Sequence, residues 1–246
     1  MSNHSSEKVD RLAIRERPKG FPIMHQNWGK LLFMHWRIDE EKLRPLIPER
    51  LKIDTFDGSA WIGVIPFTMW NVRLSFTPPV PWLSAFHEIN VRTYVHYEGV
   101  PGVWFFSLDA NSSVAVLGAR TLYNLPYFNA RINLEQEGER IDYSSSRTDE
   151  PPADFNATWT IEDKLSLSDP DSLDFYLTER YCLYSVKGER LNRLRIHHRP
   201  WPLQTATVQS YSSTMIESHG LPTPEGEPVL HYAEELEVDF WSPDEV

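Results

Sequence analysis

The chain has 246 residues and a formal net charge of -11, from 24 Lys and Arg against 35 Asp and Glu. An acidic surface repels phosphate groups and no basic tract interrupts it, so we expect neither nucleic acid nor an anionic membrane as a partner. Hydrophobic residues make up 41% of the chain, which is enough for a sizeable core in one domain.

The polar N-terminus and the single cysteine indicate a cytoplasmic protein. Residues 1–20 are typical of a flexible arm and lack the apolar stretch of a signal peptide. Residues 21–246 are expected to form a single domain, as a monomer or small homo-oligomer. No apolar run approaches the ~20 residues of a membrane helix. Cys182 alone cannot form an intrachain disulfide.

Short strands separated by turn signals run through most of the chain, as its 19 prolines favour. Two short helices are predicted, at residues 39–46 behind the cap Asp39 and at 171–180. Strands are predicted at residues 28–36, 51–54, 60–72 with a bulge or edge at Pro66, 86–97, 103–110, up to 132 after Pro126, as a hairpin within 135–154, and at 159–161, 180–186, 191–198, 206–211 and 231–241. Residues 114–121 continue this strand-rich centre, and residues 75–81 form a loop. The pattern is mainly β (β-rich α+β) and favours a barrel or a sandwich with a few short helices.

Residues 118–128, GARTLYNLPYF, resemble the active-site stretch of acetoacetate decarboxylases, whose pattern reads G-x-R-E-x-x-G-x-P-K-K. In that family the first lysine after the proline forms a Schiff base with the substrate. Tyr127 stands in its place here, and no lysine occurs between Lys52 and Lys164. A phenol cannot form an imine, so the resemblance implies the scaffold without its nucleophile.

A broader resemblance covers residues 21–215, which are similar to the YqjF-like family (DUF2071). It rests on the phrases WIGVIPF at 61–67, NVRTYV at 90–95, VWFFSLDA at 103–110, LPY at 125–127 and HRPWPL at 198–203. Together the two resemblances imply an acetoacetate decarboxylase-like β-barrel with a ligand pocket inside.

The predicted strand at 86–97 carries the clearest polar pattern. Alternation places Glu88, Asn90, Arg92 and Tyr94 on one face, which is either a wet surface or a polar barrel interior. The resemblance puts Glu88 where the related enzymes keep a pocket glutamate, and a carboxyl group there would have a raised pKa and could move protons. Arg92 could instead pair with Glu98 at the surface.

Two further arginines are candidate anion anchors. The resemblance places Arg37 near an arginine that contacts the substrate carboxylate, a task that suits its planar fork. A surface arginine is the alternative. Arg120 lies in an apolar stretch and should be paired if buried, with Glu88 or Asp109 as natural partners.

Four more side chains are candidate pocket residues, and for Tyr123, Tyr127 and His198 the alternative is a structural role in the core. Tyr123 and Tyr127 could donate phenolic hydrogen bonds to a ligand, and Tyr127 joins Glu88 as a candidate catalytic residue. His198 could point into the pocket, and Trp201 between two prolines resembles a rigid pocket wall.

The sequence indicates neither a metal site nor a cofactor. His197 and His198 face opposite sides of a strand, and no other cluster has ligand spacing. Glycine-rich phosphate loops are absent. Three hypotheses follow: an enzyme without Schiff-base chemistry acting on a small acid or carbonyl compound, a non-catalytic binder of such a ligand, or a scaffold for a protein partner.

Overall fold

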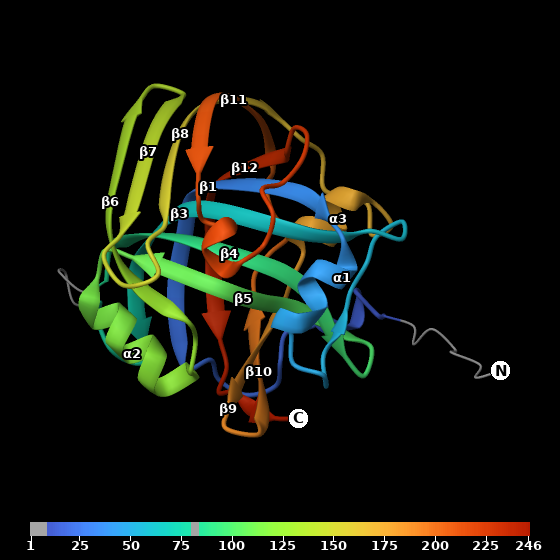
Figure 1. Ribbon diagram of the computed structural model, residues 1–246. Helices are drawn as coiled ribbons and strands as arrows, with labels where there is room; N and C mark the ends of the chain where they lie inside the picture. Colours follow the sequence, from blue (N-terminus) through green and yellow to red (C-terminus); the bar gives the residue numbers. More distant parts are fainter. Residues whose placement is uncertain (1–8, 80–83) are drawn as a thin grey trace.

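The computed structural model describes residues 9–79 and 84–246, and the chain in these ranges is dominated by one large sheet (Figure 1). Residues 1–8 of the predicted arm and the end of the predicted loop at 75–81 lie outside the described residues. The strands are β1 (Met24–Ile38), β2 (Lys52–Ile53), β3 (Ala60–Leu74), β4 (Phe86–Tyr97), β5 (Val100–Ala110), β6 (Tyr127–Glu137), β7 (Arg140–Arg147), β8 (Asp154–Lys164), β9 (Cys182–Lys187), β10 (Arg190–His197), β11 (Gln204–Ser213), β12 (Val229–Phe240) and β13 (Asp244–Glu245).

The helices in the described ranges are short. They are α1 (Glu40–Leu43), α2 (Ser113–Tyr123) and α3 (Leu173–Thr178), with single 3-10 turns at Ala13–Arg15, Arg44–Leu46 and Glu217–His219. The two predicted helices correspond to α1 and α3. Asp39 caps α1 as predicted, because its carboxylate accepts the backbone N–H of Glu41. None of the helices in the described residues is long and apolar enough to cross a membrane.

The prediction of a strand-rich stretch at 114–121 is wrong, because these residues form α2. The Ser112 side chain accepts the backbone N–H of Ala115 and caps the helix, and Asn124 ends it in the left-handed conformation. The apolar run that suggested a strand therefore has helical spacing. Ala115, Ala119 and Leu122 project from one side of it.

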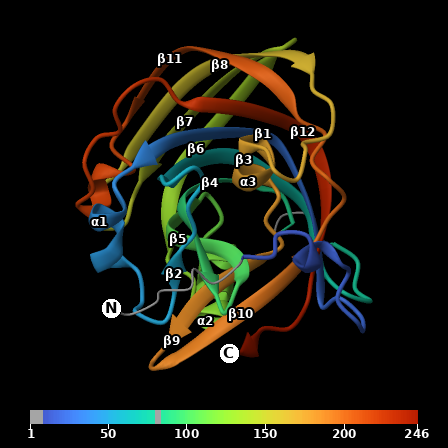
Figure 2. The same ribbon diagram turned by 90° about the vertical axis from the view of Figure 1, so that its right-hand side faces the viewer.

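The strand pairings close on themselves. A first circuit runs from β4 through β5, β9, β10, β12, β1 and β3 back to β4. A second circuit leaves β5 through β6, β7, β8 and β11 and rejoins the first at β12. Strands β12, β1, β3, β4 and β5 belong to both circuits and form a shared wall. In Figure 2 the middle of this wall lies between β7, β8 and β11 on one side and β9 and β10 on the other.

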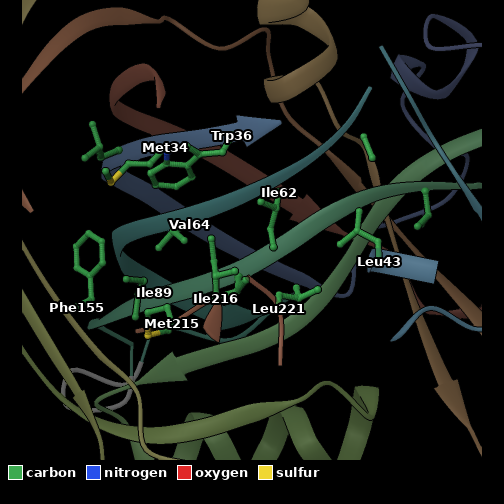
Figure 3. Close-up of a cluster of buried hydrophobic side chains, with 14 of the residues drawn as sticks. Met34, Trp36, Leu43, Ile62, Val64, Ile89, Phe155, Met215, Ile216 and Leu221 are labelled. Atoms are coloured by element: carbon green, nitrogen blue, oxygen red, sulfur yellow. The ribbon is translucent and has the colours of Figure 1, made fainter. Parts of the chain in front are cut away.

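Both faces of the shared wall are buried against separate cores. The hairpin-side core packs wall residues such as Val64 and Ile89 against Phe155, Trp159 and Met215, as Figure 3 shows in part. The cavity-side core contains Phe67 and Leu108 with residues of α2, β9 and β10. Because side chains alternate along each strand, neighbouring residues of one wall strand enter different cores.

Pro66 lies at an irregularity in the wall, as predicted. The pairing of β1 with β3 shifts register between Gly29 and Met34, opposite the segment that contains Pro66. A proline donates no backbone hydrogen bond, so it fits where the ladder is interrupted.

Residues 9–20 of the predicted arm are tied to the domain. Arg11 forms an ion pair with Asp54, and Arg17 with Asp239. Arg195 donates hydrogen bonds to the backbone carbonyls of Ile14 and Glu16. This part of the arm therefore contacts the sheet, and both the flexible arm and the single-domain division stay predictions.

Candidate functional site

A cavity of about 230 Å³ lies inside the first circuit, covered by α2. Most of its wall is apolar, and Trp28, Phe67, Leu108 and Phe240 contribute from four different strands. Trp28 and Trp201 stack at 6.4 Å between ring centroids and hold one side of it rigid. The closed sheet thus encloses a preformed apolar chamber with a few polar groups, which is the usual composition of a small-molecule site.

The polar groups come mainly from one face of β4. Glu88, Asn90 and Arg92 all line the cavity, at the alternate positions that the sequence pattern predicts. Their intervening neighbours Ile89 and Val91 enter the hairpin-side core. Strand β4 is paired on both sides, with β3 and β5, and this fixes the register of the polar row.

Glu88 is buried, with only 1% of its surface exposed. Burial disfavours its charged form and raises its pKa to about 8, although hydrogen bonds from Tyr127 and Asn90 oppose the shift. Its backbone carbonyl accepts a hydrogen bond from Tyr143 of the hairpin-side core at 2.9 Å. The backbone of Glu88 is therefore held in place, and burial favours the neutral form of its carboxyl group.

Tyr127 and Glu88 form a direct pair in the cavity wall. The phenolic hydroxyl of Tyr127 donates to Oε2 of Glu88 at 2.7 Å. Burial and the neighbouring carboxyl group raise the pKa of Tyr127 well above its ordinary value. The residue at the position of the Schiff-base lysine thus faces the candidate acid, but as a neutral phenol.

Arg92 is the charged group of the cavity. Its guanidinium lies 5.3 Å from the ring centroid of Phe33 and makes long hydrogen bonds of 3.4 Å to the Tyr94 hydroxyl and the Leu177 carbonyl. Within residues 9–79 and 84–246 it forms no ion pair, so the alternative partner Glu98 is not used. Arg92 is half-buried and has no carboxylate partner, so its guanidinium can bind the carboxylate of a ligand.

Three buried polar atoms along the cavity have no hydrogen-bond partner among the described residues. They are Oδ1 of Asn90, Nε of Arg92 and Nε1 of Trp201. Protein atoms cover all three, and similar atoms lie outside the cavity, for example Nε1 of Trp159 and Oγ of Ser145. They therefore do not by themselves mark a ligand site.

Arg37 and Arg120, the two arginines predicted as anchors, lie elsewhere. Arg37 is exposed, donates to the Ser59 hydroxyl at 2.6 Å and covers the ring of Trp61. It lies on β1 beyond the end of the cavity. Arg120 is exposed on the outer side of α2 and pairs with Asp149 at 2.7 Å, not with Glu88 or Asp109. Neither side chain lines the cavity: Arg37 lies past its end on β1, and Arg120 projects from the far side of a helix where the sequence suggested a strand.

Arg120 nevertheless supports the site from outside. Its Nε donates to the backbone carbonyl of Tyr127 at 2.7 Å, while Asp149 also accepts the backbone N–H of Asn129. These bonds join α2 to the start of β6. Arg120 is thus positioned to hold the backbone that carries Tyr127.

Of the remaining candidate pocket residues, two line the cavity and one is packed in the protein core. Tyr123 and Trp201 line the cavity. His198 does not: its ring stacks on Tyr181 at 4.3 Å, and its nitrogens face the backbone carbonyls of Arg199 and Arg180. Burial lowers the pKa of His198. It is a satisfied core histidine, the alternative that the apolar neighbourhood favoured.

The sequence analysis missed a buried ion pair behind the site. Arg147 donates two hydrogen bonds to Asp109, at 2.6 and 2.8 Å, and both side chains are fully buried. Asp109 follows Leu108 on β5 and faces away from the cavity. No local signal marks this pair, because its members are separated by 38 positions.

Groups for binding a metal are not gathered in the described part of the chain, where no three His, Cys, Asp or Glu side chains are suitably placed. The residues lining the cavity, all within the described ranges, include no lysine. Its ionisable side chains are those of Glu88, Arg92, Tyr123 and Tyr127, and none of the four forms an imine.

Solved structures define the fold class. The chain superposes on the enduracididine biosynthesis enzyme MppR complexed with pyruvate with a TM-score of 0.65, at 13% identity over 92% of this chain and 91% of that one. It superposes on an acetoacetate decarboxylase with a TM-score of 0.62, at 16% identity over 93% and 90% of the two chains. At these identities the likeness shows an acetoacetate decarboxylase-like fold.

The family follows from sequence. The profile of DUF2071, described as an uncharacterised conserved protein, matches residues 25–237. The uncharacterised protein YqjF of Bacillus subtilis is 45% identical over 224 residues, which is 91% of this chain and 93% of that protein. The chain therefore belongs to the DUF2071 family, and its resemblance to YqjF is confirmed.

Proposed function

We propose that the chain binds a small organic acid that also carries a carbonyl group, and that Glu88 exchanges a proton with this ligand. The single observation that carries the proposal is the polar row on β4, where an unpaired cation and a protonated acid face one apolar cavity. Arg92 would hold the carboxylate, and Glu88 with Tyr127 would face the carbonyl. Arg92 replaces Arg37 and Arg120 as the anchor.

The spacing of the row supports a ligand with two polar groups. Glu88 and Arg92 are four residues apart, or roughly 13 Å along the strand at ~3.3 Å per residue. The long Arg92 side chain shortens that span. A buried acid with a pKa of about 8 suits proton exchange beside a carbonyl, because it can donate and accept near neutral pH.

Binding can be measured by calorimetry with 4-oxopentanoate, using pentan-2-one as the matched ligand without a carboxylate. Loss of a charge-assisted hydrogen bond costs ~1.5–3 kcal/mol, so Arg92→Leu should weaken 4-oxopentanoate binding about 10- to 100-fold. Arg37→Leu, the same change outside the cavity, should leave the affinity intact. Equal effects of both substitutions would place the anion site elsewhere.

The catalytic part has its own readout. In deuterated water, NMR should show accelerated exchange of the protons beside the carbonyl of bound 4-oxopentanoate, and Glu88→Gln should abolish it. Binding without exchange would leave a ligand-binding protein, which is the second candidate function. Borohydride with 4-oxopentanoate should leave the protein mass unchanged, because the cavity offers no amine. A covalent adduct on one of the seven lysines would contradict this.

A further inference from the structure

The cavity has a polar inner end and an apolar outer end. Glu88 and Asn90 are 1% and 4% exposed, whereas Leu74 and Leu122, which line the same cavity, are 58% and 67% exposed. Strands β3 and β4 are antiparallel, so the end of β3 at Leu74 and the end of β4 at Arg92 lie at opposite ends of the cavity. Leu74 is at the opening and Arg92 is at the buried end. Polarity therefore falls from the buried end toward the opening.

Helix α2 forms one side of the outer half, and three of its five cavity-lining residues have small side chains. Ala115, Gly118, Ala119 and Leu122 face the cavity, at positions i, i+3, i+4 and i+7 of one helical face. A methyl group added at Gly118 would meet nothing within 4 Å. The free space next to this helix therefore belongs to the cavity and has not been filled by the protein.

The inner end carries the polar groups of the cavity. Glu88, Asn90 and Arg92 line it, and Arg92 has no carboxylate partner among the described residues. A guanidinium forms strong charge-assisted hydrogen bonds with a carboxylate. A polar head group is thus expected at this end, and an apolar continuation of the ligand is expected beside α2.

We infer that the ligand is an amphipathic acid, whose carboxylate lies at Arg92 and whose unbranched apolar tail extends along α2 toward Leu74 and Leu122. This inference rests on the proposed function and names its ligand class. A cavity of ~150 Å³ holds benzene, so the 230 Å³ here has room for roughly nine non-hydrogen atoms. Gly118 and Ala119 then set the length of the tail.

The test is a series of straight-chain acids from propanoate to octanoate, measured by calorimetry. Each methylene buried in the cavity should tighten binding about fourfold, until the tail reaches the opening near hexanoate or heptanoate and the gain stops. Gly118→Leu should remove the gain for the longer acids while leaving propanoate binding unchanged. Gly118→Ala is the matched control, because it adds only one methyl group at the same position.

Ala119→Leu, from the same helical face, provides a second variant should the first fail to fold, and circular dichroism would monitor folding. An affinity that does not depend on chain length, but is still lost in Arg92→Leu, would overturn the inference and leave the proposed function standing. Failure of every acid, including 4-oxopentanoate, to bind the wild-type protein would overturn both. A chain-length gain that persists in Gly118→Leu and Ala119→Leu would show that the tail does not lie along α2.

Discussion

The two faces of the shared wall use the same strands for different purposes. On the hairpin side, Ile89 and Trp159 are completely buried, and the charged residues Asp109 and Arg147 satisfy each other. On the cavity side, Arg92 has no carboxylate partner in the described chain, and the Glu88 carboxyl group is bonded only to neutral side chains. One face pairs its buried charges with each other, and the other keeps a cation without a counter-ion beside a cavity, which is where we place the ligand.

The comparison predicts its largest effect on the hairpin side. Asp109 is the only ion-pair partner of Arg147 among the described residues. Asp109→Asn leaves the buried Arg147 charge uncompensated, so the variant should lose about 3–5 kcal/mol of unfolding free energy. Urea unfolding measures the loss. Asp142→Asn is the matched control, since its bidentate pair with Arg140 on the same strand is exposed and should matter little. Comparable losses in both would mean that Arg147 is not sealed in the core.

The next effect concerns pH on the cavity side. Glu88 has a folded pKa of about 8 against ~4.3 in an unfolded chain. The folded state therefore keeps a proton that the unfolded state releases, and the resulting stability is present at low pH and is lost as pH rises toward 8. Between these limits the free energy of unfolding, relative to Glu88→Gln, should fall by roughly 1.4 kcal/mol per pH unit.

Urea unfolding of wild type and Glu88→Gln at pH 5, 6, 7 and 8 gives this difference directly. The glutamine variant should become the relatively more stable protein as pH rises. Parallel pH profiles would indicate a solvated, ionised Glu88 and would remove it as the proton donor.

The smallest effect is a gain. Gly118→Ala fills empty space in a helix and should raise the free energy of unfolding by about 0.8–1.0 kcal/mol. Gly63→Ala, in the wall opposite Arg92, should lower it, because the new methyl group would approach the His35 ring and Ile65 at 2.8 Å. Thermal unfolding distinguishes the two signs. A loss at Gly118 would mean that the space beside α2 is already closed.

The part of the site that the sequence predicts is the part set by local rules. Alternation along β4 placed Glu88, Asn90 and Arg92 on one face, and burial of that strand on both sides made the alternation meaningful. The resemblance to the decarboxylases placed Tyr127 at the position that meets Glu88. The mainly β fold followed from prolines and turn signals spread along the chain.

The predictions that failed have three different physical causes. Arg147 finds Asp109 only through the pairing of β5 with β6 and of β6 with β7. The apolar run of α2 fits a strand as well as a helix until the cap at Ser112 is considered. Arg37 continues the inward face of β1, but the cavity ends before it, and no local pattern reveals where a cavity ends.

The most direct test of the account is a crystal structure of the wild-type protein grown with hexanoate. We predict electron density inside the first strand circuit, with the carboxylate within hydrogen-bond distance of Arg92 and the tail running beside Gly118 toward Leu122. Hexanoate bound only at the surface, for example at Arg37, or a cavity filled by rearranged side chains, would contradict the central claim that the unpaired face of the wall is a binding site.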